Sequence, residues 1–259
     1  GYSLTGEGDI LSGAKIKNAM KHDIAVIHYA ETDSTNTQAK RLLSNGEANG
    51  TLLVTADNQT AGRGRQGKTF YSPPRTGIYM SLVIHPNTML QNAVTATTAA
   101  AVAVCRAIER LTDIRPQIKW VNDVYVNNKK ICGILTEAVS DFELGIVTSV
   151  IVGIGINIKT NDFPEDVERA GSLNTDIRRA DLIGAVADEL LDIIGGKYSD
   201  FIDYYRSHSM IIGKHINYIE NGIVTPATAI SIDEAGGLVV KTENGTEKTL
   251  KSGEISIRW

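Results

Sequence analysis

Cysteine is scarce in this sequence, with two residues, Cys105 and Cys132, among 259. Neither lies close in the sequence to another Cys or to a His, so neither a disulfide framework nor a zinc-site spacing is indicated. The chain also lacks an apolar run of the roughly 20 residues that span a bilayer, and its start lacks the basic and apolar regions of a signal peptide. We therefore expect a soluble, cytoplasmic protein without a membrane partner.

An excess of positive charge is absent as well, because 26 Lys and Arg stand against 30 Asp and Glu, giving a net charge of −4. Aromatic residues make up 6% of the chain. Proteins that bind nucleic acid over their whole surface are usually basic, and RNA-binding modules stack bases on aromatic side chains, so both features argue against these classes. The 42% of apolar residues is enough for the core of one large domain or two.

Apolar patterning predicts a mixture of strands and helices up to about residue 212. Residues 91–111 contain no Gly or Pro and predict a helix of about five turns. Other helices are expected at 12–21, 37–43, 179–194 and 198–207, with Ser12 as a cap. Strands are expected at 24–29, 51–56, 78–84, 118–120, 124–126, 131–139 and 147–158.

The pattern changes at about residue 213. From there, short alternating strands are separated by the turn pairs Asn221-Gly222, Gly236-Gly237 and Asn244-Gly245. This predicts a small β-barrel that follows an α/β body, with a domain boundary near residue 212. Residues 1–9, which include three glycines, are expected to form an arm or linker.

A polar loop from residue 57 to about 74 carries the first candidate site, Gly62-Arg63-Gly64-Arg65-Gln66-Gly67. Its spacing matches a dinucleotide-binding fingerprint, but Phe70-Tyr71-Ser72-Pro73-Pro74 follows where that site needs a helix. Glycines admit a ligand close to the backbone, and two arginines suit a phosphate or carboxylate. The alternatives are a solvated loop and an Arg-Gly segment that touches RNA.

The second candidate site spans residues 119–137, in which Asn127-Asn128 predicts a tight hairpin turn. Such a hairpin can bring Lys119, Asp123 and Lys130 together. Cations neutralise the charge that develops as pyrophosphate leaves, and a carboxylate can hold a metal or orient an amine. The alternative is that both lysines are ordinary surface residues and that Gly133 is a strand bend.

Gly153-Ile154-Gly155-Ile156-Asn157 is the third candidate site, because its glycines weaken an apolar strand. Two explanations stay open: a ligand that lies against the backbone, or the close packing of a helix.

The order and spacing of these motifs, preceded by Asp33-Ser34-Thr35-Asn36 and Gln59, resemble those of the biotin protein ligases over residues 24–258. The resemblance implies an α/β (α+β) catalytic domain of the class II aminoacyl-tRNA synthetase and biotin ligase type at 23–212. It also implies an SH3-like barrel at 213–259. Residues 1–22 would be a linker and short helix, the remnant of a junction to a missing domain.

The resemblance also assigns roles to residues. The biotin ureido ring would be held by Ser34, Thr35, Gln59 and the backbone of Gly62 and Arg63. The apolar slot for the thiophane ring and chain of biotin would be lined by Tyr79, Gly133, Leu135 and Gly153, and Phe70 would lie near the adenine and biotin. The phosphates and the biotin carboxylate would be bound by Arg63, Arg65, Lys119 and Lys130, which are the expected catalytic residues together with Asp123. The remaining substrate-binding residues would be Asn36, Gly64, Asn122, Gly155 and Asn157.

The implied reaction is ATP-dependent formation of biotinyl-5′-AMP and transfer of biotin to a lysine. Biotin and ATP would be substrates, with Mg²⁺ near Asp123, and the glycine-rich loop would close over the adenylate. Expected partners are the biotin carboxyl carrier domain of a carboxylase and a second copy of the chain. Val121 stands where the family commonly has Pro, and Gln66 replaces a frequent basic residue.

Residues 1–4 resemble the last strand of the winged-helix domain in ligases that also repress biotin genes. We therefore expect a chain of that bifunctional type without its DNA-binding domain, unable to bind an operator. Two other interpretations are a lipoate protein ligase, which shares the fold and the acyl-adenylate strategy but fits the 62–67 and 119–123 motifs poorly, and an RNA-binding module.

Overall fold

A computed structural model describes residues 9–85, 93–141, 146–165, 167, 169–198, 200–220 and 222–257. The predicted remnant strand at 1–4, the start of the helix at 91 and the turn residue Asn221 lie outside these residues. No helix in the described ranges is both long and apolar enough to cross a membrane.

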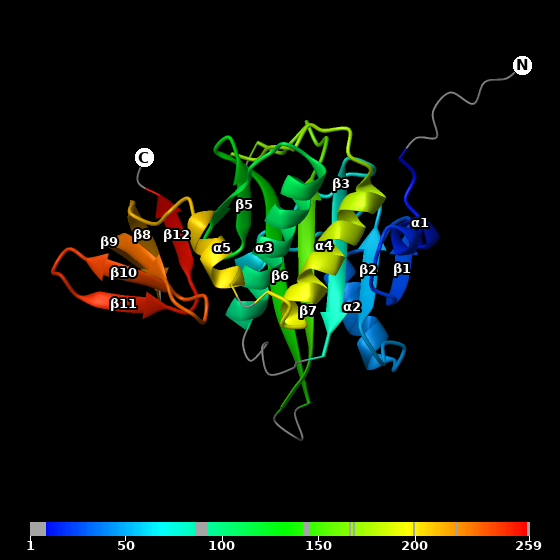
Figure 1. Cartoon of the computed structure of the whole chain (residues 1–259), viewed down its shortest axis with the longest axis horizontal. Helices are drawn as coiled ribbons and strands as arrows, with labels where there is room; N and C mark the ends of the chain where they lie inside the picture. Colours follow the sequence, from blue (N-terminus) through cyan, green and yellow to red (C-terminus); the bar gives the residue numbers. More distant parts are fainter. Residues whose placement is uncertain are drawn as a thin grey trace, which may run out of the picture.

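A seven-stranded sheet forms the centre of the larger part of the molecule (Figure 1). Its strand order is β1-β2-β3-β7-β6-β5-β4, in which β1 and β2 are parallel and the other pairs are antiparallel. The strands are β1 (Ala25–Tyr29), β2 (Leu52–Ala56), β3 (Gly77–Ile84), β4 (Gln117–Lys119), β5 (Asp123–Val126), β6 (Lys129–Asp141) and β7 (Ile146–Asn157).

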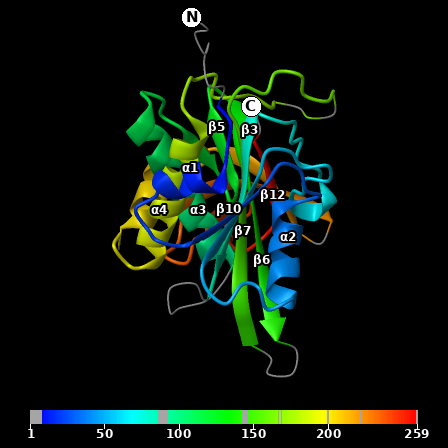
Figure 2. The ribbon, with the colours of Figure 1, turned by 90° about the vertical axis from the view of Figure 1, so that its right-hand side faces the viewer.

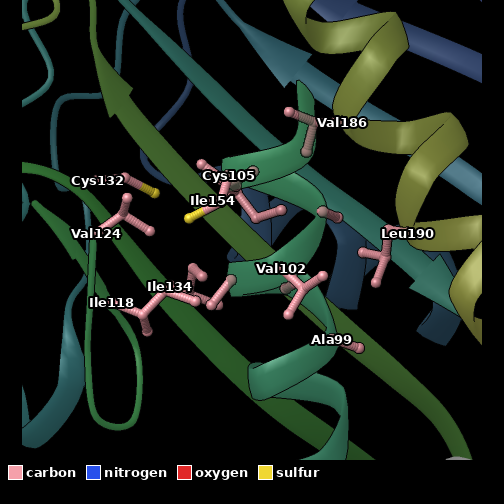
Figure 3. Close-up of a cluster of buried hydrophobic side chains, with 14 of the residues drawn as sticks. Ala99, Val102, Cys105, Ile118, Val124, Cys132, Ile134, Ile154, Val186 and Leu190 are labelled. Atoms are coloured by element: carbon pink, nitrogen blue, oxygen red, sulfur yellow. The ribbon is translucent and has the colours of Figure 1, made fainter. Parts of the chain in front are cut away.

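Helices cover both faces of this sheet (Figure 2). One face carries α1 (Gly13–Asn18), α3 (Ala93–Leu111) and α4 (Arg179–Ile194), and the other carries α2 (Thr35–Ser44). The core lies between α3, α4 and the sheet, where Ala99, Val102 and Cys105 of α3 pack against Ile134 and Ile154 (Figure 3). Small and β-branched side chains let α3 lie close to the sheet.

Both cysteines belong to this core. Cys105 on α3 and Cys132 on β6 are fully buried, and burial raises the pKa of each thiol well above its usual value. Buried, protonated thiols act as small apolar side chains. Both cysteines are free, in agreement with the prediction that they do not form a disulfide framework.

A five-stranded antiparallel sheet follows α5 (Phe201–Ser207), in the order β11-β10-β9-β8-β12. Side chains of the α/β body donate hydrogen bonds to it. Among them, Trp120 Nε1 donates to the Gly236 carbonyl at 2.9 Å, and Arg206 Nε donates to the Ile232 carbonyl at 2.7 Å. Its strands are β8 (His215–Glu220), β9 (Ile223–Ile232), β10 (Leu238–Thr242), β11 (Glu247–Leu250) and β12 (Glu254–Ile257).

The predicted elements are present, with shifted ends. Helix α1 ends at Asn18 and not at residue 21, because the amides of Lys21 and His22 donate to the Asp188 carboxylate. Helix α5 begins at Phe201 and not at 198. Helix α2 begins at Thr35, two residues earlier than predicted, after the extended residue Ser34. The predicted turn at Asn127-Asn128 is confirmed by φ values of 50° and 59°.

Candidate active site

A cavity of about 740 Å³ lies on the α2 side of the sheet. Its walls come from the start of α2, the loop between β2 and β3, the strands β4 to β7, and the turn before β12. This volume is within the range of sites for small organic ligands. The sheet supplies the floor, and residues far apart in the sequence supply the rim.

The start of α2 forms a fixed polar end of the cavity. Thr35 donates its backbone N–H to Gln59 Oε1 at 2.9 Å, and Gln59 Nε2 donates to Ser72 Oγ at 2.8 Å. Ser34, Thr35 and Asn36 are nearly fully buried, so their polar atoms need partners within the site. Both the oxygen and the nitrogen of the Gln59 side-chain amide therefore have a partner, which fixes the orientation of the amide.

Asn36 connects this polar end to Glu137 on β6. Its Nδ2 donates to the Leu135 carbonyl at 3.1 Å and to Glu137 Oε2 at 2.9 Å. The other oxygen of Glu137 contacts Lys40 Nζ at 2.8 Å and Arg63 Nη1 at 3.3 Å. A side chain at position 153 would begin within 3.0 Å of Asn36 Oδ1, so the close helix packing considered for Gly153 is confirmed.

The glycine-rich loop folds back on itself at Gly62. Phe70 donates its N–H to the Gly62 carbonyl at 2.9 Å, and Gly64 donates to the Lys68 carbonyl at 2.7 Å. The chain then forms a single 3₁₀ turn, η1 (Arg65–Gly67), rather than the α-helix that a dinucleotide-binding site requires. The backbone conformation therefore supports the prediction that these glycines do not form a dinucleotide-binding fingerprint.

Phe70 lies across the two glycines Gly133 and Gly155, which face each other on neighbouring strands. A Cβ at Gly155 would begin within 3.0 Å of the Phe70 ring. Tyr79 packs edge-on against Phe70, with ring centroids 6.4 Å apart, and donates its hydroxyl to the Pro73 carbonyl at 2.8 Å. Burial raises the pKa of Tyr79 to about 12, so this hydroxyl stays protonated. The aromatic pair and the glycines make a narrow apolar slot.

Basic side chains line the end of the cavity that lies away from Thr35 and Gln59. Lys130 Nζ lies 2.7 Å from Asp123 Oδ1, and Lys119 lines the same wall. Arg65 Nη1 donates to Asn122 Oδ1 at 3.1 Å, and its Nη2 donates to the Gly253 carbonyl at 3.3 Å. Asn122 Nδ2 donates to Asp123 Oδ1 at 3.0 Å, which joins these residues in one network.

Most of the predicted site residues line the cavity. They are Ser34, Thr35, Asn36, Gln59, Arg63, Gly64, Arg65, Phe70, Lys119, Asn122, Asp123, Lys130, Gly133, Leu135, Gly153 and Gly155. Gly62, Tyr79 and Asn157 lie behind it. Gly62 supports Phe70, Tyr79 backs the same ring, and Asn157 donates Nδ2 to the Gly171 carbonyl at 3.1 Å. In the part of the chain that the structure describes, Asn157 Oδ1 is buried without a hydrogen-bond partner.

Several lining residues were not predicted. Gly253 and Ile255 reach the cavity from the C-terminal sheet, and Pro164 and Val167 from the loop after β7. The others are Gln66, Lys68, Thr69, Tyr71, Met80, Trp120, Ile134 and Ile154. A strand turn more than a hundred residues from the glycine-rich loop carries no local sequence signal that would place it there.

Arg179 is a further unpredicted residue, at the back of the site. It is 1% exposed and donates Nε to Asp9 Oδ2 and Nη1 to Asp57 Oδ1, both at 2.8 Å, and Nη2 to the Asp9 carbonyl. Asp57 begins the loop that contains Gln59 and the glycines. Arg179 therefore fixes the base of that loop.

The sequence predicted a metal ion near Asp123. In the structure the Asp123 carboxylate is already paired with Lys130. Within the described ranges there is no cluster of three or more His, Cys, Asp or Glu residues that could hold a metal ion. Mg²⁺ prefers several oxygen ligands and commonly arrives with the phosphates of a nucleotide. These donors suit an ion carried by ATP better than a resident one.

Comparisons with known proteins agree with this geometry. The Biotin/lipoate A/B protein ligase family model matches residues 29–157, and the Biotin protein ligase C terminal domain matches residues 211–258. The bifunctional ligase/repressor BirA of Bacillus subtilis is 34% identical over 272 residues, which cover 99% of this chain and 82% of that protein. BirA of Escherichia coli is 28% identical, over 100% of this chain and 81% of that protein.

Solved structures are similar as well. The biotin protein ligase from Aquifex aeolicus in complex with biotin and ATP has a TM-score of 0.75 and 29% identity, covering 90% of this chain and 98% of that one. The apo structure of the same ligase has a TM-score of 0.69 and 26% identity, with the same coverage. The chain belongs to the biotin protein ligase family.

Proposed function

We propose that this protein joins biotin to ATP as biotinyl-5′-AMP and then transfers the biotinyl group to a lysine of a biotin carboxyl carrier domain. The observation that carries the proposal is the division of one cavity into three parts: a fixed polar end at Thr35 and Gln59, an apolar slot across Gly133 and Gly155, and a basic end at Lys130. Biotin has matching parts in its ureido ring, its sulfur-containing ring with an alkyl chain, and its carboxylate.

In the first step a carboxylate oxygen of biotin attacks the α-phosphorus of ATP. The new O–P bond forms as the bond to the pyrophosphate oxygen breaks, and pyrophosphate leaves. Lys119, Lys130 and Arg65 line the end of the cavity where this charge develops, and fixed cations stabilise such a transition state. Mg²⁺ enters as part of the MgATP substrate and neutralises phosphate charge.

In the second step the acceptor lysine, as a neutral amine, attacks the anhydride carbonyl. The amide bond forms, AMP leaves, and the amine loses a proton. Asp123 lies at the basic end with one oxygen engaged by Lys130 and Asn122, so its carboxylate can orient the incoming amine or accept its proton.

The direct test mixes purified protein with biotin, MgATP and a carrier domain, and reads the product on an avidin blot. We expect ATP-dependent labelling that is lost when the acceptor lysine is changed to Ala. A parallel reaction with lipoate, read with an anti-lipoyl antibody, tests the alternative ligase. The match of residues 211–258 to the C-terminal domain of biotin protein ligases favours biotin. Labelling by lipoate alone would overturn the proposal.

Asp123→Asn is expected to slow lysine transfer about 100-fold, because the general base is lost while the side chain keeps its shape. The rate is measured from preformed biotinyl-5′-AMP, so that the first step does not contribute. Adenylate formation is followed separately through pyrophosphate release. If transfer from the adenylate proceeds at the wild-type rate, Asp123 takes no part in deprotonating the amine.

Arg65→Gly is expected to release adenylate into solution, because Arg65 joins the glycine-rich loop to Asn122 and to the Gly253 carbonyl. A loop without this link cannot hold the cavity shut. The measurement is biotin label on a bystander protein such as albumin, with Arg75→Gly, a change in the same loop outside the cavity, as the matched control. Adenylate formed at a normal rate without bystander label would count against closure by Arg65.

The remaining expectations stay predictions. They are a catalytic domain at 23–212 with an SH3-like domain at 213–259, a homodimer, and a cytoplasmic location.

A further inference from the structure

Three polar side chains, Ser81, Asn36 and Glu137, form a chain of short contacts that begins at Thr35. Ser81 on β3 has its Oγ 2.7 Å from Thr35 Oγ1 and 2.6 Å from Asn36 Oδ1. Asn36 in turn donates Nδ2 to Glu137 Oε2 and to the Leu135 carbonyl. Ser81 is fully buried and does not line the cavity, so it can influence a ligand only through its neighbours Thr35 and Asn36, which do line it.

The orientation of the Asn36 amide is fixed by two acceptors. A carbonyl oxygen and a carboxylate oxygen both face one end of the amide, so that end must be the NH₂ group. Burial opposes ionisation of Glu137, but hydrogen bonds from Lys40 and Asn36 and the charges of Lys40 and Arg63 outweigh it and lower its pKa. Glu137 is therefore a carboxylate with no hydrogen to donate, and Asn36 Oδ1 faces Ser81.

Counting hydrogens then settles the direction of the remaining bonds. Asn36 Oδ1 has no hydrogen, so Ser81 must use its single hydroxyl hydrogen there. The 2.7 Å contact between the two hydroxyls still requires a hydrogen, which Thr35 must supply. The Thr35 hydroxyl is thus committed to Ser81, and the Gln59 Oε1 atom 3.2 Å away is served by the Thr35 backbone N–H. Thr35 Oγ1 presents lone pairs to the cavity.

We propose that Ser81, held by Asn36 and Glu137, is a positioning residue that makes the Thr35 hydroxyl an obligatory acceptor and so selects a ligand with an N–H at this point. The inference rests on the proposed function, in which that group is a ureido N–H of biotin. A ring oxygen in the same place would meet the lone pairs of Thr35 with no hydrogen between them. The protein therefore rejects such a ligand by electrostatic repulsion and an unpaired acceptor.

The test compares biotin with its two cyclic carbamate analogues, each of which has one ureido N–H replaced by oxygen. Calorimetry gives the dissociation constants for the wild-type protein, Ser81→Ala and Thr35→Val. We expect the wild type to reject one analogue by at least about 100-fold. In Ser81→Ala the Thr35 hydroxyl is free to turn and donate to the ring oxygen, so this ratio falls at least about tenfold, while biotin itself weakens by no more than about tenfold.

Two further variants separate positioning from a general structural effect. Ser149→Ala removes another buried serine hydroxyl, on the neighbouring strand β7, and is expected to leave the ratio unchanged. In a Thr35→Val background, Ser81→Ala is expected to have no further effect on the ratio, because the hydroxyl it orients is gone.

The outcomes are distinguishable. Equal weakening of biotin and both analogues in Ser81→Ala overturns the inference, since a structural role would not discriminate between ligands. A wild-type protein that binds biotin and both analogues equally overturns it as well. A wild-type protein that binds no biotin contradicts the proposed function itself.

Discussion

Lys130→Met should reduce the rate of biotinyl-5′-AMP formation about 1000-fold. Two effects act in the same direction. The cation that faces the phosphates is removed, which costs roughly 3–4 kcal/mol of transition-state stabilisation in comparable sites. The Asp123 carboxylate, 2.7 Å from Lys130 Nζ, also loses its partner and repels the incoming ATP. Methionine retains the apolar part of the side chain, so the fold should persist.

The measurement is pyrophosphate release at saturating biotin and MgATP, with the unfolding temperature recorded for each variant. Lys129→Met is the matched control, because Lys129 is the neighbouring residue on β6, is exposed and does not line the cavity. Adding Asp123→Asn to Lys130→Met should recover part of the loss by removing the unpaired charge. A rate for Lys130→Met within threefold of the wild type would remove Lys130 from the mechanism.

Gly62→Ala is expected to weaken biotin binding by more than about 100-fold. The added Cβ would lie within 3.0 Å of the Phe70 carbonyl and of Ser72 Oγ. A backbone carbonyl cannot turn aside as a side chain can, and Phe70 N–H is bonded to the Gly62 carbonyl, so the whole loop must move. The strain is about 1–3 kcal/mol, and relieving it displaces Phe70 and Ser72, which hold the apolar slot and Gln59.

Gly64→Ala is the matched control in the same loop. Its added Cβ would have its nearest contact, the Lys68 carbonyl, at 3.2 Å, which a shift of a few tenths of an ångström can relieve. Calorimetry with biotin and thermal unfolding are measured for both variants. Equal losses in the two would mean that loss of backbone freedom, and not the contact with Phe70, is what these glycines prevent.

Local sequence patterns predicted the helices and strands because their apolar faces repeat at short intervals. The ends of α1 and β6 were missed because a tertiary contact decides the first and cross-strand pairing decides the second. Asp188 accepts the amides that would have continued α1, and the pairing of Asp141 with Ile146 extends β6 beyond residue 139.

The site was predictable to the extent that motif order carries information. Residues of the three motifs line one cavity. The sequence did not show which motif residues face the cavity and which lie beneath its surface. Side chains alternate between the two faces of β3, so the sequence predicts the face on which Tyr79 lies. It does not predict that Phe70 packs against the Tyr79 ring. Gly253, Ile255 and Arg179 were missed because long-range tertiary contacts alone bring them to the site.

The contact between Arg65 and the Gly253 carbonyl makes ligand binding depend on the folding of the C-terminal sheet. One wall of the cavity belongs to the small C-terminal sheet, so heat or denaturant that opens this sheet alone would abolish binding while the seven-stranded sheet stays folded. The protein can therefore bind its ligands only up to the temperature at which this small sheet opens, whatever the stability of the seven-stranded sheet.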